Sequence, residues 1–122
     1  MRVHASYNGI EADFETEKGL FSPSAPDRGT MAMLSAVRFE PGQRVLDLGC
    51  GWGLVGVLAA KICGAENVAM CDKDPLAVEA ARRNAEINGV PEARVYVSDG
   101  LSGVEETGFD LILSNPPYQS DF

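Results

Sequence analysis

The chain is 122 residues long, 45% hydrophobic and 23% charged, with a net charge of −8. These values are ordinary for a globular protein, and the length predicts a single domain, residues 1–122, with its own core. No apolar run reaches the roughly 18 residues of a transmembrane helix, and the N-terminus leads into polar residues instead of a signal peptide. The acidic balance argues against bulk electrostatic binding of nucleic acid, although a nucleic acid held at a local site stays compatible with it.

Three cysteines, Cys50, Cys63 and Cys71, are an odd number without the spacing of a metal site. Such cysteines fit a reducing compartment. We therefore expect a cytoplasmic protein with no membrane association and no metal centre, in which the cysteines are small packing residues. Cys50 and Cys71 stand at neighbouring strand ends, where they are expected to line any pocket formed there.

Residues 1–21 are expected to form an N-terminal β-hairpin. The turn signal Asn8-Gly9 lies between two loosely alternating stretches. It predicts a strand over residues 3–6 paired with a strand over residues 10–15.

Residues 22–42 connect this hairpin to a regular pattern of strands and helices. They hold a loop rich in Pro, Ser and Gly and a predicted helix over residues 30–38. The pattern that follows predicts strands over 44–48, 67–71, 94–98 and 109–114, and helices over 54–63 and 75–88. Strands that alternate with helices in this way predict an α/β fold with a parallel sheet and right-handed crossovers.

A glycine-rich turn follows the first of these parallel strands, in the sequence VLDLGCGWG (45–53). Glycines at a strand-to-helix turn permit positive φ and let the backbone approach a ligand. In open parallel sheets ligands bind beyond the carboxyl ends of the strands. This turn is therefore the predicted cofactor site.

Two cofactors fit the spacing of the turn. Gly51, Gly53 and Gly56 match the dinucleotide fingerprint, with Asp72 near the expected distance. The run from Asp47 to Gly53 alternatively matches the Asp-x-Gly-x-Gly-x-Gly signature of an S-adenosyl-L-methionine (SAM) site. Asp47 favours SAM over NAD, because a carboxylate suits a cationic ligand and is unfavourable beside a pyrophosphate.

Three further residues near the turn are candidate cofactor contacts. Asp72 ends the second parallel strand, where its carboxylate can accept hydrogen bonds from ribose hydroxyls. Asp99 ends the third and is placed to bind the adenine amino group, unless it is a plain turn residue before Gly100. Trp52 fits either a contact with the cofactor or core packing, and the sequence leaves both open.

Four segments together carry a resemblance to a known family: VLDLGCGWG (45–53), CDKDPLAVEAARRNAEINGV (71–90), VSDG (97–100) and SNPPY (114–118). In this order and spacing the chain resembles the class I SAM-dependent methyltransferases. More narrowly, it is similar to the small-domain group that includes the ribosomal RNA guanine-N2 methyltransferases. The resemblance implies a Rossmann-like doubly wound parallel sheet with strand order 3-2-1-4. It also implies cofactor binding by Asp47, Gly49, Gly51, Gly53, Asp72, Asp99 and Asn115.

The resemblance gives the SNPPY segment a catalytic role. It implies that the Asn115 side-chain carbonyl and the Pro116 backbone carbonyl accept hydrogen bonds from an exocyclic amine, while Tyr118 stacks on the base. Two fixed acceptors can aim the amine lone pair at a methyl group, and alignment is the main gain in such a transfer. The alternative is that the prolines only end a strand, since they cannot donate to a ladder.

Members of this family continue past the SNPPY motif with further helices and strands, whereas this chain ends at Phe122. We therefore expect a truncated domain in which the strand over 109–114 is an uncovered edge that can self-associate. Cofactor binding is then expected to be weak and catalysis poor.

The predicted function is SAM-dependent methylation of an exocyclic amine, with guanine N2 of ribosomal RNA as the first candidate. Adenine-N6 methylation of nucleic acid and glutamine methylation of a protein share the motif. A non-catalytic SAM-binding module is the alternative outside enzymes.

Overall fold

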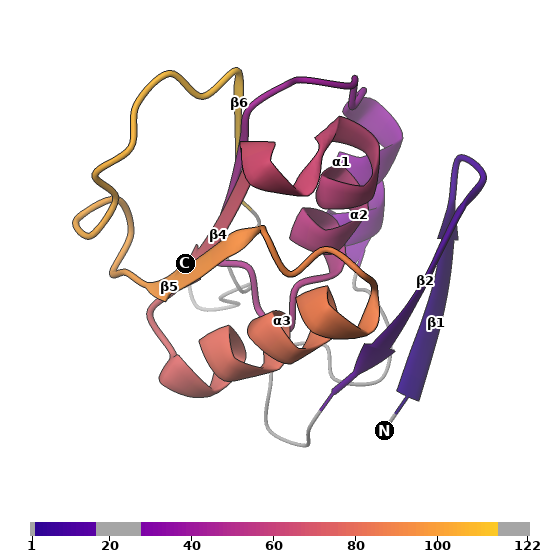
Figure 1. Ribbon diagram of the computed structural model, residues 1–122, viewed down its shortest axis with the longest axis horizontal. Coiled ribbons are helices and arrows are strands. Elements are labelled where there is room, and N and C mark those ends of the chain that lie inside the picture. Colours follow the sequence, from indigo (N-terminus) through magenta and orange to yellow (C-terminus); the bar gives the residue numbers. More distant parts are fainter. Residues whose placement is uncertain (1, 17–27, 115–122) are drawn as a thin grey trace.

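The structure is a computed structural model that describes residues 2–16 and 28–114; Asn115, Pro116 and Tyr118 lie outside the described residues. In chain order the elements are β1 (Arg2–Tyr7), β2 (Ile10–Glu15), α1 (Arg28–Ala36), β3 (Val45–Leu48), α2 (Leu54–Cys63), the short 3-10 helix η1 (Ala65–Asn67), β4 (Val68–Asp72), α3 (Pro75–Ile87), β5 (Arg94–Val97) and β6 (Leu111–Ser114) (Figure 1). All predicted elements are present. Helix α1 begins and ends two residues earlier than predicted, β6 begins two residues later, and η1 was not predicted.

Four parallel strands form the central sheet, in the order β5-β4-β3-β6. Counted along the chain among these four strands, the order is third, second, first, fourth. Leu48 pairs with Cys71 on one side and with Ser114 on the other, and Cys71 pairs with Tyr96. This register brings the carboxyl ends of all four strands to one edge of the sheet, the edge at which such sheets bind ligands.

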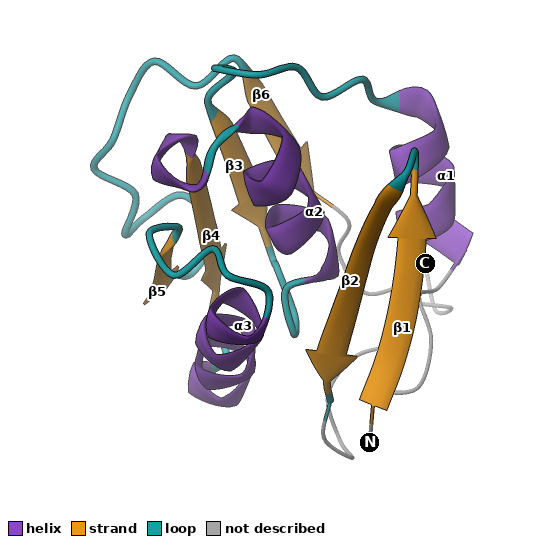
Figure 2. Ribbon diagram, turned by 45° about the vertical axis from the view of Figure 1, so that its right-hand side comes forward, coloured by secondary structure: helices purple, strands orange, loops and turns teal. Residues whose placement is uncertain are grey.

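The two faces of the sheet are covered differently. Helices α2 and α3, the two α-helices that connect sheet strands in the described part of the chain, lie on the same face (Figure 2). Alternate strand residues point toward these helices, among them Val45, Val68, Met70 and Val95. The opposite face carries a smaller cluster around Leu46, Ala69 and Cys71, against which Val104 and Phe109 of the loop before β6 pack.

The N-terminal hairpin lies beside α2 and α3, away from the sheet (Figure 2). Asn8 and Gly9 have φ angles of 49° and 83°, and such positive values at both central positions are those of the predicted hairpin turn. Its inner face is apolar, and Phe14 is completely buried. The hydroxyl of Tyr7 donates to the backbone oxygen of Leu34 at 2.8 Å, which fastens the hairpin to α1.

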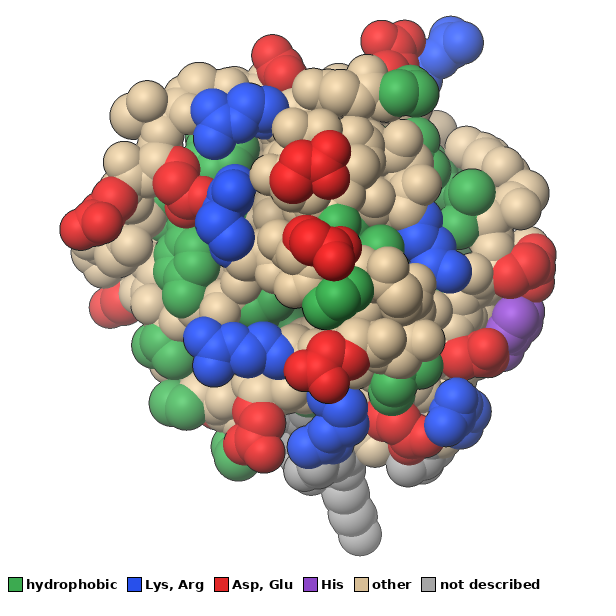
Figure 3. All heavy atoms as spheres, in the orientation of Figure 1, with side chains coloured by type: hydrophobic (Ala, Val, Ile, Leu, Met, Phe, Trp, Pro, Cys, Tyr) green, Lys and Arg blue, Asp and Glu red, His purple; other side chains and the backbone are tan. Residues whose placement is uncertain are grey.

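Charged side chains of both signs are mixed on the surface. On the face in Figure 3, Lys and Arg alternate with Asp and Glu and do not gather into one basic patch. Several arginines have acidic partners, as in the ion pairs Arg94–Glu106 and Arg83–Glu79. Within the described ranges, no helix combines the length and the apolar character needed to cross a membrane.

Candidate cofactor site

The glycine-rich turn after β3 uses its glycines for two different purposes. Gly49, Gly51 and Gly53 have φ angles of 76°, 55° and 98°, in the left-handed region that favours glycine. A Cβ added to Gly49 or Gly51 would meet no atom within 4 Å, whereas one on Gly53 would lie 3.2 Å from the Cβ of Ala81. The first two glycines therefore face open space, and the third allows the turn to pack against α3.

The backbone N–H groups of this turn are bonded inside the protein. Gly49 and Cys50 both donate to the backbone oxygen of Cys71, at 2.8 and 2.9 Å. Gly51 donates to Oδ2 of Asp72 at 2.9 Å. A pyrophosphate is bound by backbone N–H groups that point toward it. Since these N–H groups are already engaged with β4 and its end, the geometry counts against the dinucleotide interpretation.

Asp47 lies beneath the turn and is only 3% exposed. Its Oδ2 accepts a hydrogen bond from the backbone N–H of Gly56 at 3.0 Å. Gly56 is the third residue of α2, and the N-cap Gly53 has no side chain to offer, so the carboxylate satisfies one of the free N–H groups at the start of the helix. A Cβ on Gly56 would lie 2.3 Å from the side chain of Met70, so any larger residue here would force Met70 or the helix to shift.

Burial raises the pKa of Asp47 to about 7, the hydrogen bond from Gly56 opposes the rise, and the negative charge of Asp72 adds to it. A carboxyl group with such a pKa is close to half ionised at neutral pH. A cation bound nearby would favour its ionised form. The site is therefore suited to a positively charged ligand.

Asp72 connects the turn to the start of α3. Its Oδ1 accepts from the backbone N–H of Asp74 at 3.0 Å, in addition to the bond from Gly51 to Oδ2. Asp74 in turn caps α3 by accepting from the N–H of Leu76 at 2.9 Å, as the Asp-Pro signal predicted. Each oxygen of the Asp72 carboxylate keeps acceptor capacity, so the predicted contact with ribose hydroxyls is compatible with these bonds.

The other candidates have separate environments. Asp99 is exposed after β5, and its backbone oxygen accepts from the N–H and the hydroxyl of Ser102, so it belongs to a turn at the same sheet edge. Trp52 is 3% exposed and packs edge-on against Phe14, with ring centroids 5.1 Å apart. Trp52 is thus a core residue, which decides the alternative that the sequence left open.

The three cysteines are free thiols and buried, as predicted. Burial is the main cause that raises the pKa of each of them above its ordinary value. They are therefore neutral packing groups at physiological pH and not nucleophiles.

One buried polar residue beside the turn was not predicted. Asn84 of α3 has no exposed surface, and its Nδ2 donates to the backbone oxygen of Trp52 at 2.7 Å. The helical spacing from Ala77 and Ala81 places Asn84 on the buried face of α3. A polar residue at an apolar helical position was the signal that could have identified it.

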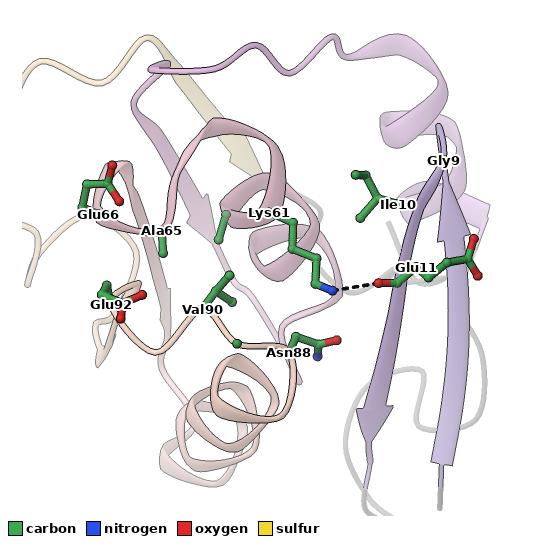
Figure 4. A pocket seen from close by; sticks show the side chains of 11 residues that line it. Gly9, Ile10, Glu11, Lys61, Ala65, Glu66, Asn88, Val90 and Glu92 are labelled. Carbon is green, nitrogen blue, oxygen red and sulfur yellow. Dashed lines mark hydrogen bonds between the residues drawn. The ribbon is translucent and has the colours of Figure 1, made fainter.

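A separate cleft of about 530 Å³ lies between the hairpin, the C-terminal end of α2 and the loop after α3 (Figure 4). Lys61 crosses it and donates to the backbone oxygen of Glu11 at 2.8 Å. Helix α2 begins at the glycine-rich turn, so a cleft at its other end is distinct from the candidate cofactor site.

The fold and the turn define a class I methyltransferase-like α/β domain, and comparison with known proteins identifies the family. The model of the family "Methyltransferase small domain" matches residues 11–122, and the chain belongs to this family. It is 42% identical over 103 residues to ribosomal RNA small subunit methyltransferase C of Hahella chejuensis, covering 84% of this chain and 30% of that protein. The protein of the same name from Escherichia coli is 36% identical over 112 residues, covering 92% of this chain and 32% of the relative.

Solved structures show the same similarity. The T. thermophilus 16S rRNA N2 G1207 methyltransferase (RsmC), in complex with AdoMet and guanosine, has a TM-score of 0.88 and 28% identity, covering all of this chain and 34% of that one. A Pyrococcus abyssi tRNA (uracil-54, C5)-methyltransferase in complex with S-adenosyl-L-homocysteine has a TM-score of 0.68 and 25% identity, covering 95% of this chain and 28% of that one. The chain spans about a third of the length of the relatives it matches.

Proposed function

We propose that this chain is the cofactor-binding part of a SAM-dependent methyltransferase that methylates guanine N2 of small-subunit ribosomal RNA, with residues 1–122 as one domain. The similarity to small-subunit methyltransferases and to a structure that holds AdoMet and guanosine supports the reaction and the substrate. The observation that carries the proposal is the pair formed by the buried Asp47 and the N–H of Gly56. This pair puts a carboxylate where a dinucleotide-binding protein would need free N–H groups for a pyrophosphate.

Each candidate cofactor residue has a chemical task in this proposal. When bound, SAM supplies a methyl group on a positively charged sulfur. Asp47 provides negative charge beneath the turn, and Gly49 and Gly51 leave the space into which the cofactor fits, while Gly53 sets the path of the turn. Asp72 accepts hydrogen bonds from ribose hydroxyls, and Asp99 orients the adenine amino group.

The catalytic residues proposed are Asn115, Pro116 and Tyr118, which follow β6 in the sequence. The Asn115 side chain and the Pro116 backbone carbonyl accept hydrogen bonds from the exocyclic amine, and Tyr118 stacks on the base. Asn115 also borders the cofactor. The proposed task of these residues is to orient the amine toward the methyl group. This orientation requires hydrogen-bond acceptors and does not require a general base.

Titration of the chain with S-adenosyl-L-homocysteine by calorimetry, with NADH as control ligand, tests the cofactor. We expect binding of the former only; binding of NADH alone would refute the proposal.

Transfer of labelled methyl groups to ribosomal RNA lacking the modification tests the reaction. Asn115→Ala is expected to abolish transfer while the chain still binds the cofactor through its other contacts. Binding without transfer by the unaltered chain would favour a non-catalytic module.

A further inference from the structure

Asn84 of α3 and Asn88, the residue that caps the C-terminal end of this helix, pair with the outer edge of β2 as a neighbouring strand would. Asn88 accepts from the backbone N–H of Asp13 at 3.1 Å and donates to its backbone oxygen at 2.8 Å. Asn84 makes the same pair of bonds with the backbone of Glu15, at 2.7 and 2.9 Å. Each side-chain amide therefore pairs with β2 as a peptide group of an adjacent strand would.

The spacing of the two elements explains why this arrangement fits. Residues two apart on a strand are separated by about 6.7 Å, and residues four apart on a helix by about 6 Å along the axis. Asp13 and Glu15 therefore present their outward backbone groups at nearly the same interval as Asn84 and Asn88 present their side chains. The third outward position of β2 is bonded as well, because Lys61 donates to the backbone oxygen of Glu11 (Figure 4).

The two asparagines differ in the use of their second amide proton. Asn88 donates it to the backbone oxygen of Asn84, in the last turn of α3, at 2.8 Å. Asn84 donates it to the backbone oxygen of Trp52, in the glycine-rich turn, at 2.7 Å. Of the two, only Asn84 joins the hairpin, α3 and the turn.

The bond from Asn84 fixes one peptide group of the turn. The peptide between Trp52 and Gly53 is held at its oxygen by Asn84 and at its nitrogen by the backbone oxygen of Cys50, at 3.0 Å. The Trp52 ring packs against Phe14 of β2. The hairpin thus holds residue 52 through its ring and, by way of Asn84, through its carbonyl group.

We infer that Asn84 is a positioning residue for the cofactor site and that the N-terminal hairpin sets the geometry of the glycine-rich turn through it. This inference rests on the proposed function, which assigns the turn to cofactor binding. Asn84 contacts the backbone of residue 52 and not the ligand. Its removal leaves the Trp52 carbonyl without this buried donor and frees the peptide to rotate away from the orientation that the cofactor requires.

Asn84→Ala and Asn88→Ala are matched variants, because both remove a clamp on β2 and only the first releases the turn. The affinity for S-adenosyl-L-homocysteine and the midpoint of urea unfolding are measured for both. We expect both to unfold at lower urea, Asn88→Ala to bind about as tightly as the unaltered chain, and Asn84→Ala to bind about tenfold more weakly, the size of one buried hydrogen bond. Equal losses of affinity in the two variants, or none in Asn84→Ala, would overturn the inference.

A second readout needs no ligand and uses the only tryptophan of the chain, Trp52. Quenching of its fluorescence by acrylamide is expected to increase in Asn84→Ala and not in Asn88→Ala. Should Asn84→Ala fail to fold, Asn84→Leu takes its place, since leucine fills the buried site, carries no charge and has no proton to donate to the Trp52 carbonyl. If the unaltered chain binds no S-adenosyl-L-homocysteine, the proposed function fails. Equal quenching in Asn84→Ala and Asn88→Ala would overturn the positioning role of Asn84, whether or not the chain binds the ligand.

Discussion

Replacement of Asp47 by asparagine is expected to stabilise the chain, increasingly so as the pH rises. The carboxyl group is 3% exposed, and burial raises its pKa from the ordinary 3.8 to about 7. Asparagine has nearly the same size, and its carbonyl oxygen can still accept from the N–H of Gly56. The substitution therefore removes the charge while it keeps the cap on α2.

The sign and the size follow from the pKa difference. The folded chain binds the Asp47 proton more tightly than the unfolded chain, so the stability that this group contributes below pH 3.8 is lost as the pH rises through about 7. Each pH unit in this window corresponds to about 1.4 kcal/mol. Relative to pH values below 3.8, the unfolding free energy is therefore lower by about 2 kcal/mol at pH 5, where only the unfolded chain has released the proton, and by about 4 kcal/mol at pH 8.5.

Urea unfolding of both chains at these two pH values measures the effect. We expect the advantage of Asp47→Asn to grow by about 2–3 kcal/mol between pH 5 and pH 8.5. Glu105→Gln, at an exposed position, is the control and is expected to show no such growth. The same Asp47→Asn chain is expected to lose affinity for S-adenosyl-L-homocysteine. An identical pH dependence of the unfolding free energy in Asp47→Asn and the unaltered chain would refute the reasoning.

Three further predictions follow from the same structure. SAM affinity is expected to rise with pH and level off above the pKa of Asp47, about 7, because a bound cation favours the ionised carboxylate; calorimetry across this range checks it, and a flat profile would contradict it. Gly56→Ala is expected to destabilise the chain by about 1–3 kcal/mol or more, since its Cβ would overlap Met70, and thermal unfolding measures this. His4, the only histidine, bonds Asp13 and Glu11, which raise its pKa above 6.5. Its contribution to stability is present below pH 6.5 and lost as the pH rises through the raised value. An NMR titration of its ring protons with a midpoint at or below 6.5 would show that these bonds do not persist in solution.

Much of the fold could be predicted from the sequence because its signals are local. Asn8-Gly9 defines the hairpin turn, and Asp74 followed by Pro75 defines the start of α3. The parallel sheet follows from the alternation of strands and helices. The family model and the structural match confirm the fold class and the family to which these signals pointed.

The contacts of the candidate site were less predictable because they join segments that are distant in the chain. Asn84 and Asn88 bond residues 69 and 75 positions away, and no local periodicity encodes such bonds. Trp52 was ambiguous for the same reason, since its partner Phe14 belongs to the hairpin. Asp72 was expected as a ligand for ribose, and its two bonds to backbone N–H groups depend on how the turn folds over β4.

The unfolding free energy that is lost through the buried Asp47 carboxyl connects stability to cofactor binding. A domain is stable by about 5–15 kcal/mol in total, so a carboxyl group that removes about 4 kcal/mol at alkaline pH is a large penalty. Its bond to the N–H of Gly56 does not explain the charge, because a neutral asparagine could make that bond. A cation held near the carboxylate would recover the cost, since it stabilises the ionised form only in the folded chain. A loss of stability in the ligand-free chain is therefore expected if Asp47 serves ligand binding. The same carboxylate should make the chain with bound ligand more stable than the free chain.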